Sequence, residues 1–273
     1  MFSLKTILLP VDFSDRSAGV APYAKAFASQ FQSEVVLLHV DPIGRVENTY
    51  SLRTQLNALS SSEFSSLDVK RELVAGDPAA NIVKFAQAGQ VDLIMMPTHG
   101  YGPYRKFLLG SVTAKVLHDS DCPVWTSVHV EKIRPTEPVS YRKVACAVDL
   151  GPRSQQVLSW AWELASSFGA RLLVIHVTKP GESIVAQEWK PDPQVELVRR
   201  ATEDITTLLN KLKIEGEIAV ESGSVTEVAY NWAARSAADI LVIGRHAAKG
   251  IAGRLHPHAY AIIRESPCPV VSV

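Results

Sequence analysis

The sequence predicts an α/β protein made of two tandem domains, each a doubly wound, five-stranded parallel sheet. Three observations carry this prediction. The two halves of the 273-residue chain resemble each other, each half alternates apolar runs with helical patterns, and several of the runs are continuous Val, Ile and Leu. Continuous apolar runs are typical of strands buried on both faces, as in a parallel sheet between two helix layers.

The internal repeat extends over the length of the chain. Lys5–Asp12 matches Arg142–Asp149 at an offset of 137 residues, and Cys122-Pro-Val matches Cys268-Pro-Val at an offset of 146. A self-match of this length indicates a tandem duplication, because its period is far longer than that of a solenoid repeat.

The first half reads as five strands with helices between them. The run that opens it ends in Pro-Val-Asp, and the segment after it carries Ala and aromatic residues at helical spacing. We expect strands at 5–11, 34–40, 68–74, 92–97 and 123–130, and helices at 16–31, 51–66, 78–88 and 111–119.

The second half repeats this order after a linker. The segment 130–141 contains two prolines and four charged residues, so we place the domains at 1–131 and 140–273. We expect strands at 143–148, 171–177, 216–222, 239–244 and 269–273, and helices at 153–168, 192–213, 224–237 and 256–265.

Composition excludes several classes of function. The chain has 28 basic and 28 acidic residues, which argues against a broad nucleic-acid or anionic-membrane surface. No apolar run reaches the roughly 20 residues of a membrane span, and the N-terminal run reads as a first strand, not a signal peptide. Three scattered cysteines do not make a disulfide framework, so we expect a cytoplasmic protein. From the charge balance and the lack of a membrane span, we expect it to bind neither nucleic acid nor membrane.

The stretch from Asp92 to Ser111 carries the strongest functional signal. An apolar strand ends at Pro97, a loop with Gly100 follows, and Gly110-Ser111 opens a helix. Helix N-terminal N–H groups attract anions, and glycine lets the backbone approach a phosphate closely. In an open parallel sheet, ligands bind where the strand order reverses, so we expect Asp12, which ends the first strand, to face this loop.

Plainer interpretations of these residues remain open. Gly110-Ser111 alone is more often a turn followed by an N-cap than a phosphate site. Asp12 alone often caps the following helix, and Ser14 or Asp15 competes for that role. The joint spacing of the loop and Asp12 favours nucleotide binding over these alternatives.

The same residues resemble a known family. The pattern Pro97-Thr98-His99-Gly100, nine residues, then Gly110-Ser111 is similar to the phosphate loop of the universal stress protein family, in its ATP-binding subclass. That subclass has Gly, two residues, Gly, nine residues, then Gly-Ser/Thr. The resemblance covers both halves of the chain, but Pro97 stands where the family usually has its first glycine.

The resemblance implies a fold, a ligand and a function. The fold would be adenine nucleotide alpha hydrolase-like or flavodoxin-like, and the two domains would pair within the chain through their last strands. The ligand would be ATP or a related adenine nucleotide, with Mg²⁺ left open as its companion ion. The protein would act in stress adaptation by nucleotide-dependent binding, and homodimer formation is left open. The family's ligand residues carry over to Asp12 (adenosine), Val40 (backbone to adenine), and Gly100, Gly110, Ser111 and Val112 (phosphates).

The second half departs from the pattern. It keeps Asp149 and has Gly244 at the first glycine position, but Ala247 replaces the second glycine and His256-Pro257 replaces Gly-Ser. We therefore predict that this half does not bind ATP in the usual way. His246, His256 and His258 lie close in sequence, but without Cys or carboxylate neighbours at ligand spacing we expect no metal site.

Classical catalytic motifs are missing from the sequence. It contains no Walker A sequence, no Gly-x-Ser-x-Gly elbow, no His-Glu-x-x-His and no Rossmann glycine motif after the first strand. We expect no catalytic residues and no rapid turnover. Two alternatives stay open, a slow ATPase that uses the same site and an interaction scaffold that has lost nucleotide binding through Pro97.

Overall fold

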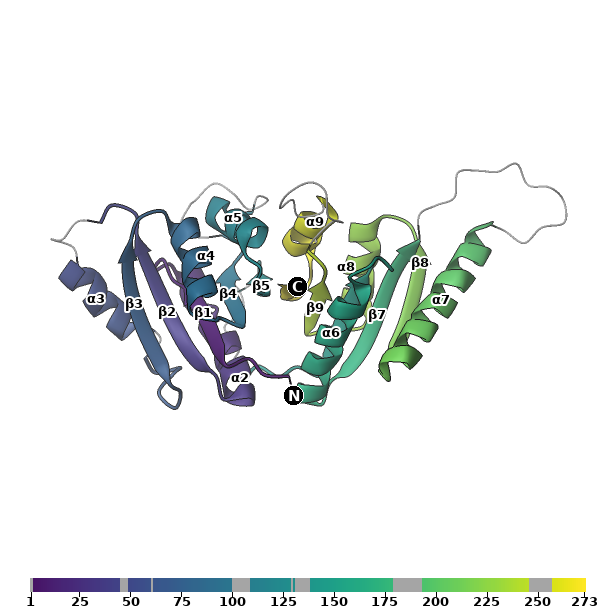
Figure 1. Cartoon of the computed structure of the whole chain (residues 1–273), viewed down its shortest axis with the longest axis horizontal. Helices are drawn as coiled ribbons and strands as arrows, with labels where there is room; N and C mark the ends of the chain where they lie inside the picture. The colour runs from purple at the N-terminus through teal and green to yellow at the C-terminus, as the bar shows by residue number, and fades with distance from the viewer. Residues whose placement is uncertain are drawn as a thin grey trace. The chain divides into compact units, whose positions relative to one another are not determined.

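The computed structural model describes residues 2–44, 49–59, 61–99, 109–128, 130, 138–178, 193–245 and 257–273. The chain divides into two compact units, one made mainly of residues 1–140 and the other mainly of residues 141–273. Each unit alternates strands and helices, as the sequence predicts (Figure 1).

The first unit has the predicted doubly wound topology. Its strands are β1 (Thr6–Pro10), β2 (Glu34–Asp41), β3 (Val69–Ala75), β4 (Leu93–Pro97) and β5 (Val124–Ser127). Its helices are α1 (Asp15–Ala18), α2 (Ala21–Phe31), α3 (Thr49–Ala58), α4 (Pro78–Ala88) and α5 (Ser111–Asp119). The strands pair in parallel in the order β3-β2-β1-β4-β5, with Ile7 opposite both Val35 and Leu93. Chain order reverses between β1 and β4, which confirms the predicted switch point.

The second unit repeats this topology. Its strands are β6 (Lys143–Val148), β7 (Arg171–Thr178), β8 (Glu217–Ser222), β9 (Ile240–Ile243) and β10 (Val270–Ser272). Its helices are α6 (Ser154–Phe168), α7 (Pro193–Leu212), α8 (Val225–Arg235) and α9 (Pro257–Glu265). The order is β8-β7-β6-β9-β10, and Val144 lies opposite Leu172 on one side and Ile240 on the other.

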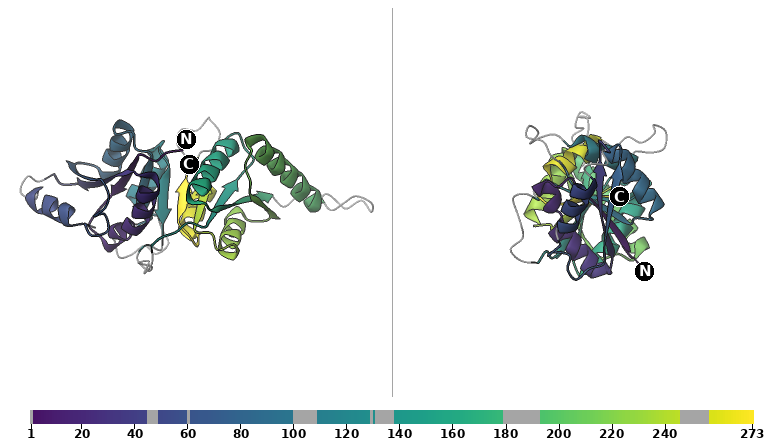
Figure 2. Two further views of the ribbon diagram at one scale, coloured as in Figure 1. Left: turned by 90° about the horizontal axis from the view of Figure 1, so that it is seen from below. Right: turned by 90° about the vertical axis from the view of Figure 1, so that its left-hand side faces the viewer.

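Helices cover both faces of each sheet. In the first unit, α2 and α3 lie against one face and α4 and α5 against the other (Figure 2). Every residue of β4 and of β9 is buried, which is the expected consequence of two helix layers. The edge strand β3 is only partly buried, because just one strand pairs with it.

The single helix predicted at 16–31 is wrong. The structure has the short α1, a break at Gly19 and Val20, and then α2 with Pro22 in its first turn. A Cβ at Gly19 would lie 2.4 Å from the carbonyl oxygen of Val130, so only glycine allows this backbone approach. Proline lacks the N–H that would continue the helix through this point.

Two further boundaries differ from the prediction by more than two residues. The helix expected at 51–66 ends at Ala58, and the strand expected at 123–130 ends at Ser127. Both predicted ends fall in polar or mixed sequence, where hydrophobic periodicity does not define the last residue.

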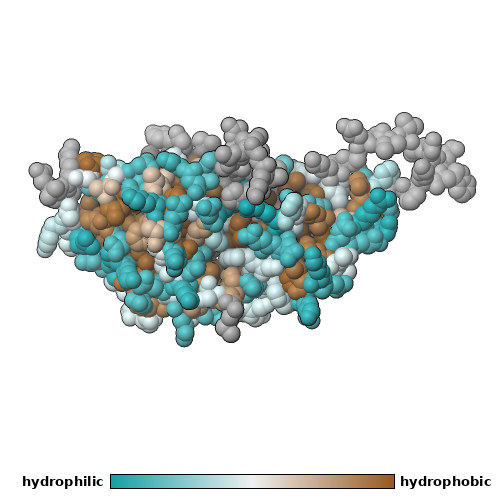
Figure 3. Space-filling model, viewed as in Figure 1, coloured by the Kyte–Doolittle hydropathy of each residue, from teal (hydrophilic) through white to brown (hydrophobic). Residues whose placement is uncertain are grey.

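The longest described helix, α7, carries its charges in pairs on an exposed face. Glu196 accepts hydrogen bonds from Arg199 and Arg200, at 2.7 Å in both cases, and these bonds lower its pKa to about 2. Figure 3 shows hydrophilic residues over this helix on the viewed face. Among the described residues, no helix combines the length and apolar composition needed to cross a bilayer.

Candidate functional site

The first part of the candidate site is the loop that follows β1. Asp12 comes directly after this strand, and its Oδ1 accepts hydrogen bonds from the backbone N–H and the hydroxyl of Ser14, at 3.1 and 2.5 Å. Ser14 is the N-cap of α1, where its Oγ accepts from the N–H of Ser17. The competing interpretation that Ser14 caps the helix is therefore correct. Asp12 orders the loop and keeps an exposed carboxylate at the carboxyl end of β1.

Val40 lies one residue before the end of the neighbouring strand β2. The carbonyl of Leu38 accepts from the N–H of Val11 at 2.9 Å, so Leu38 points its backbone groups toward β1. Because backbone groups alternate in direction along a strand, those of Val40 point to the same side, beyond the end of β1. The predicted adenine contact thus lies beside the Asp12 loop.

A histidine joins these two strands. Nδ1 of His39 lies 2.7 Å from the carbonyl oxygen of Val11, and its ring stacks on Phe13 with centroids 4.2 Å apart. Phe13 has a φ of 61°, the left-handed conformation that turns the chain toward α1. His39 therefore holds the shape of the Asp12 loop.

The other side of the site is the end of β4. Pro97 is the last residue of this strand, and its carbonyl accepts a hydrogen bond from Oγ1 of Thr113 in α5 at 3.0 Å. The carbonyl of Thr98 accepts from the N–H of Gly110 at 2.8 Å. These two bonds fasten the start of α5 to the end of β4.

Helix α5 begins without a side-chain cap. Gly110 is its N-cap with a φ of −59°, and no side-chain hydrogen bond satisfies the first turn within the described residues. Ser111 is exposed and Val112 partly so. An uncapped helix start presents backbone N–H groups and partial positive charge to an anion. Gly100 lies outside the described residues.

Sequence reasoning missed Arg16 as a member of this region. Burial of His99 lowers its pKa, and the positive charge of Arg16 lowers it further, so the guanidinium acts on the end of β4 from the first helix. Arg16 stands four residues after Asp12, and a cation in the first helical turn was the signal that could have identified it.

The topology brings these residues to one edge of the sheet. Strands β2, β1 and β4 are consecutive neighbours and all run parallel. Asp12, Val40 and the start of α5 therefore all lie at the carboxyl edge, on the two sides of the switch point. A carboxylate on one side and uncapped N–H groups on the other suit a ligand with hydroxyl groups at one end and an anion at the other.

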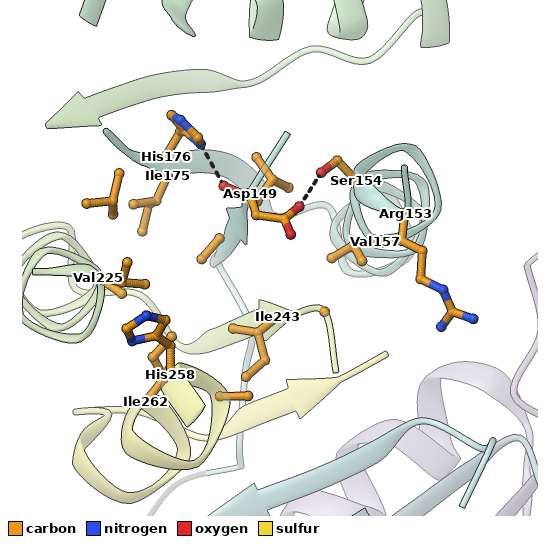
Figure 4. Close-up of a pocket in the computed structure, with 16 residues that line it drawn as sticks. Asp149, Arg153, Ser154, Val157, Ile175, His176, Val225, Ile243, His258 and Ile262 are labelled. Atoms are coloured by element: carbon orange, nitrogen blue, oxygen red, sulfur yellow. Dashed lines mark hydrogen bonds between the residues drawn. The ribbon is translucent and has the colours of Figure 1, made fainter. Parts of the chain in front are cut away.

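The second unit repeats part of this arrangement around a cavity. Oδ1 of Asp149 accepts from the N–H of Gly151 at 2.8 Å and from Oγ of Ser154 at 2.9 Å, and Nδ1 of His176 lies 2.8 Å from the carbonyl oxygen of Val148 (Figure 4). The cavity beside them has a volume of about 480 Å³. Sequence reasoning gave no indication of this cavity.

Comparison with known proteins identifies two copies of one kind of domain. The sequence model of the universal stress protein family matches residues 3–127 and again residues 140–273. Two universal stress proteins of Methanocaldococcus jannaschii are each 32% identical to this chain, over 135 and 149 residues. Each alignment covers 44% of this chain, and they cover 79% and 92% of those proteins.

A solved structure matches the whole chain. The crystal structure of a universal stress protein from Archaeoglobus fulgidus has a TM-score of 0.73 and 24% sequence identity. The match covers 99% of this chain and 96% of that one. At this level of identity, the likeness establishes the fold.

Proposed function

The chain belongs to the universal stress protein family, and from this premise we propose that its first half binds ATP or a related adenine nucleotide. The observation that carries the proposal is the uncapped start of α5 across the switch point from Asp12. Binding would serve a nucleotide-dependent role in stress adaptation in the cytoplasm, through recognition of the bound state and not through rapid turnover.

Different residues of the first half would bind different parts of the ligand. The phosphates would lie beside Gly110, at the N–H groups of Ser111 and Val112, where the helix start attracts negative charge. The N–H of Gly110 itself donates to the carbonyl of Thr98. The adenosine would lie toward Asp12 and the backbone of Val40, because a carboxylate accepts hydrogen bonds from ribose hydroxyls. Gly100 would complete the phosphate loop.

Pro97 does not remove a hydrogen bond that the helix start needs. Its carbonyl is the acceptor for Thr113, and proline keeps its carbonyl although it lacks an N–H. The N–H groups proposed to hold phosphate belong to the residues of the loop and of α5. We therefore expect nucleotide binding to survive the departure from the family pattern at this position.

Gly110→Asp is a selective test of this site. Aspartate is a preferred N-cap residue, so the variant should keep α5 folded while its carboxylate takes the N–H groups and repels phosphate. Isothermal titration of the full chain should show ATP affinity at least about 100-fold weaker than in the wild type, since both the N–H groups and the favourable potential are lost.

The second half supplies a matched control. The equivalent position is His256, so H256D places the same carboxylate at the start of α9. ATP affinity should stay within about twofold of the wild type, because the proposed site is in the other half. Equal ATP affinity in the wild type and G110D would disprove the assignment, as would a loss of binding caused by H256D.

A further inference from the structure

The cavity in the second unit has the character of a small-molecule site. Side chains from β6, β7, β9, α6, α8 and α9 enclose it, and its walls are mainly aliphatic. The aliphatic residues labelled in Figure 4 are Val157, Ile175, Val225, Ile243 and Ile262. Pockets of about 300–1,000 Å³ with apolar walls and a few polar groups are typical of ligand sites. At about 480 Å³ this cavity falls inside that range.

Several positions in the wall of the cavity carry smaller side chains than the equivalent positions of the first unit. Four wall residues of the second unit replace larger ones at the offsets of the internal repeat. The replacements are Pro10 by Ala147, Ile82 by Ala229, Pro97 by Gly244 and Thr113 by Ala259. Each change removes side-chain atoms from the same region, between the carboxyl edge of the sheet and the helices α8 and α9.

The polar side chains that line the cavity are Asp149, Arg153, Ser154, His176 and His258, and among them we consider Asp149 as the group that orients a ligand. Both hydrogen bonds to the Asp149 carboxylate go to Oδ1, so within the described residues Oδ2 accepts none. In Figure 4 the second carboxylate oxygen points away from Ser154 toward the side on which Ile243 lies. The guanidinium of Arg153 points away from this carboxylate in the same view. The mouth of the cavity therefore presents a hydrogen-bond acceptor with negative charge.

The helix start beside the cavity is unsuited to phosphate. α9 begins at Pro257, whereas the equivalent helix of the first unit begins at Ser111. Proline has no N–H to donate, and the Asp149 carboxylate repels an anion. The small flexible residue and the hydroxyl of the first half are replaced here by His256 and Pro257.

We propose that this cavity is a second ligand site, for a mainly apolar, phosphate-free small molecule that donates a hydrogen bond from a hydroxyl or amine to Asp149. The aliphatic walls enclose the apolar body of the ligand, and Oδ2 of Asp149 selects the donor group. The two halves then hold ligands of different chemistry. This inference concerns residues of the second half alone, so it does not depend on nucleotide binding in the first.

Three indole compounds of nearly equal size test the chemistry. Tryptophol carries a hydroxyl donor, tryptamine an ammonium group and indole-3-acetate a carboxylate. With about a dozen non-hydrogen atoms each, the first two should bind with dissociation constants of about 1 mM. Indole-3-acetate should bind at least about fivefold more weakly than tryptophol, because its charge meets that of Asp149.

Methyl NMR of the full-length protein locates the binding. With labelled isoleucine, tryptophol and tryptamine should shift the signals of Ile243 and Ile262 and leave those of Ile7 and Ile94 in the first sheet unchanged. The proposal is overturned if none of the compounds shifts the cavity isoleucines. It is also overturned if indole-3-acetate binds as tightly as tryptophol, or if the shifts are confined to the first half.

Two variants separate filling of the cavity from loss of its polar group. A229I restores the residue that stands at Ile82 in the first half, and it should abolish binding of both donors by occupying the cavity. Asp149→Asn removes the charge and should bring indole-3-acetate to within about twofold of tryptophol. The matched control Asp12→Asn, in the first half, should leave all three affinities unchanged. An Asp149→Asn variant that keeps the full preference for donors would contradict the role of the carboxylate.

Discussion

The two halves of the chain agree at one edge of their sheets and differ at the other. At the amino edge, Oδ2 of Asp92 accepts from the backbone N–H groups of Lys5 and Thr6, and Oδ2 of Asp239 accepts in the same way from Arg142 and Lys143. The four distances lie between 2.7 and 2.9 Å. At the carboxyl edge, the first half has a glycine-started helix and the second has a proline-started helix over a cavity.

This contrast shows which part of the duplicated fold is constrained. The aspartate at the amino edge joins two neighbouring strands, so its loss would affect any sequence with this fold. The residues at the carboxyl edge lie in loops and at helix starts, so they can change without altering the sheet. Divergence of ligand chemistry on an unchanged frame is the expected result.

The helix after the first strand differs as well. The first half breaks it at Gly19, whereas α6 of the second half is continuous through the equivalent Gln156. The break follows from the close approach of the Val130 carbonyl in the first unit. It changes how the loop after β1 leads into the first layer of helices, close to Asp12.

The largest effect should come from truncating matched core residues. Phe27 and Leu164 are equivalent, and neither has any solvent exposure. Phe27→Ala should lower the free energy of unfolding of the first unit by about 3–5 kcal/mol, and Leu164→Ala that of the second by about 2–5 kcal/mol, through lost burial and cavity formation. Hydrogen exchange with mass spectrometry measures each unit separately. If either variant deprotects both halves equally, the halves are not independent and the comparison fails.

The shared aspartate should give an intermediate effect that is the same in both halves. Asp92→Ala and Asp239→Ala each remove an acceptor for two backbone N–H groups, so each should cost its own unit about 1–2 kcal/mol. Urea unfolding, monitored by hydrogen exchange, gives the change in unfolding free energy of each unit. Asn at either position keeps one acceptor oxygen and serves as the milder control. If the loss of unfolding free energy differs by more than about 1 kcal/mol between the halves, the two aspartates do not have equivalent roles.

The smallest effect concerns the start of α4 and depends on pH. Asp77 caps this helix by accepting from the N–H of Ala80, and that bond and the Lys115 ammonium lower its pKa below the ordinary value of 3.8. A carboxyl whose folded pKa is lowered contributes stability above its unfolded pKa and loses it as the pH falls through the folded pKa. Asp77→Ser should therefore weaken the acid sensitivity of the first unit.

The second half provides the reverse experiment. Ser224 holds the equivalent position before α8 and makes no side-chain cap bond. S224D should introduce, as the pH falls below the ordinary Asp pKa of 3.8, the acid sensitivity that Asp77→Ser removes. Calorimetry of both variants over this range compares the melting temperatures. Acid sensitivity unchanged in D77S would mean that the Asp77 cap does not contribute.

Much of the fold could be predicted from the sequence, because its signals are local. Buried strands such as 93–97 are continuous apolar runs. Because of the internal repeat, each element is indicated by two separate stretches of sequence. The neighbour relation of β1 and β4 followed from the small set of topologies open to a doubly wound sheet. The predicted domain boundaries and the predicted pairing of the last strands stay predictions.

The site was predicted less completely. Asp12 and the start of α5 were identified by spacing, because a glycine-started helix after a buried strand has a recognisable pattern. Arg16 and the break at Gly19 were missed, since both depend on residues far away in sequence, His99 and Val130. A local pattern could mark Arg16 as a cation in the first helical turn, but it could not show which distant residue the side chain acts on.

The sequence by itself determined the alternation of strands and helices, the duplication, and the loss of the glycine loop in the second half. Those features reside in residue type and spacing, which the chain carries before it folds. The tertiary structure alone decided that the second half, without its phosphate loop, holds a cavity of about 480 Å³ beside Asp149. The volume of this cavity is the space that side chains from six separate elements leave unfilled. It depends on how those side chains pack together, so it is defined only in the folded protein.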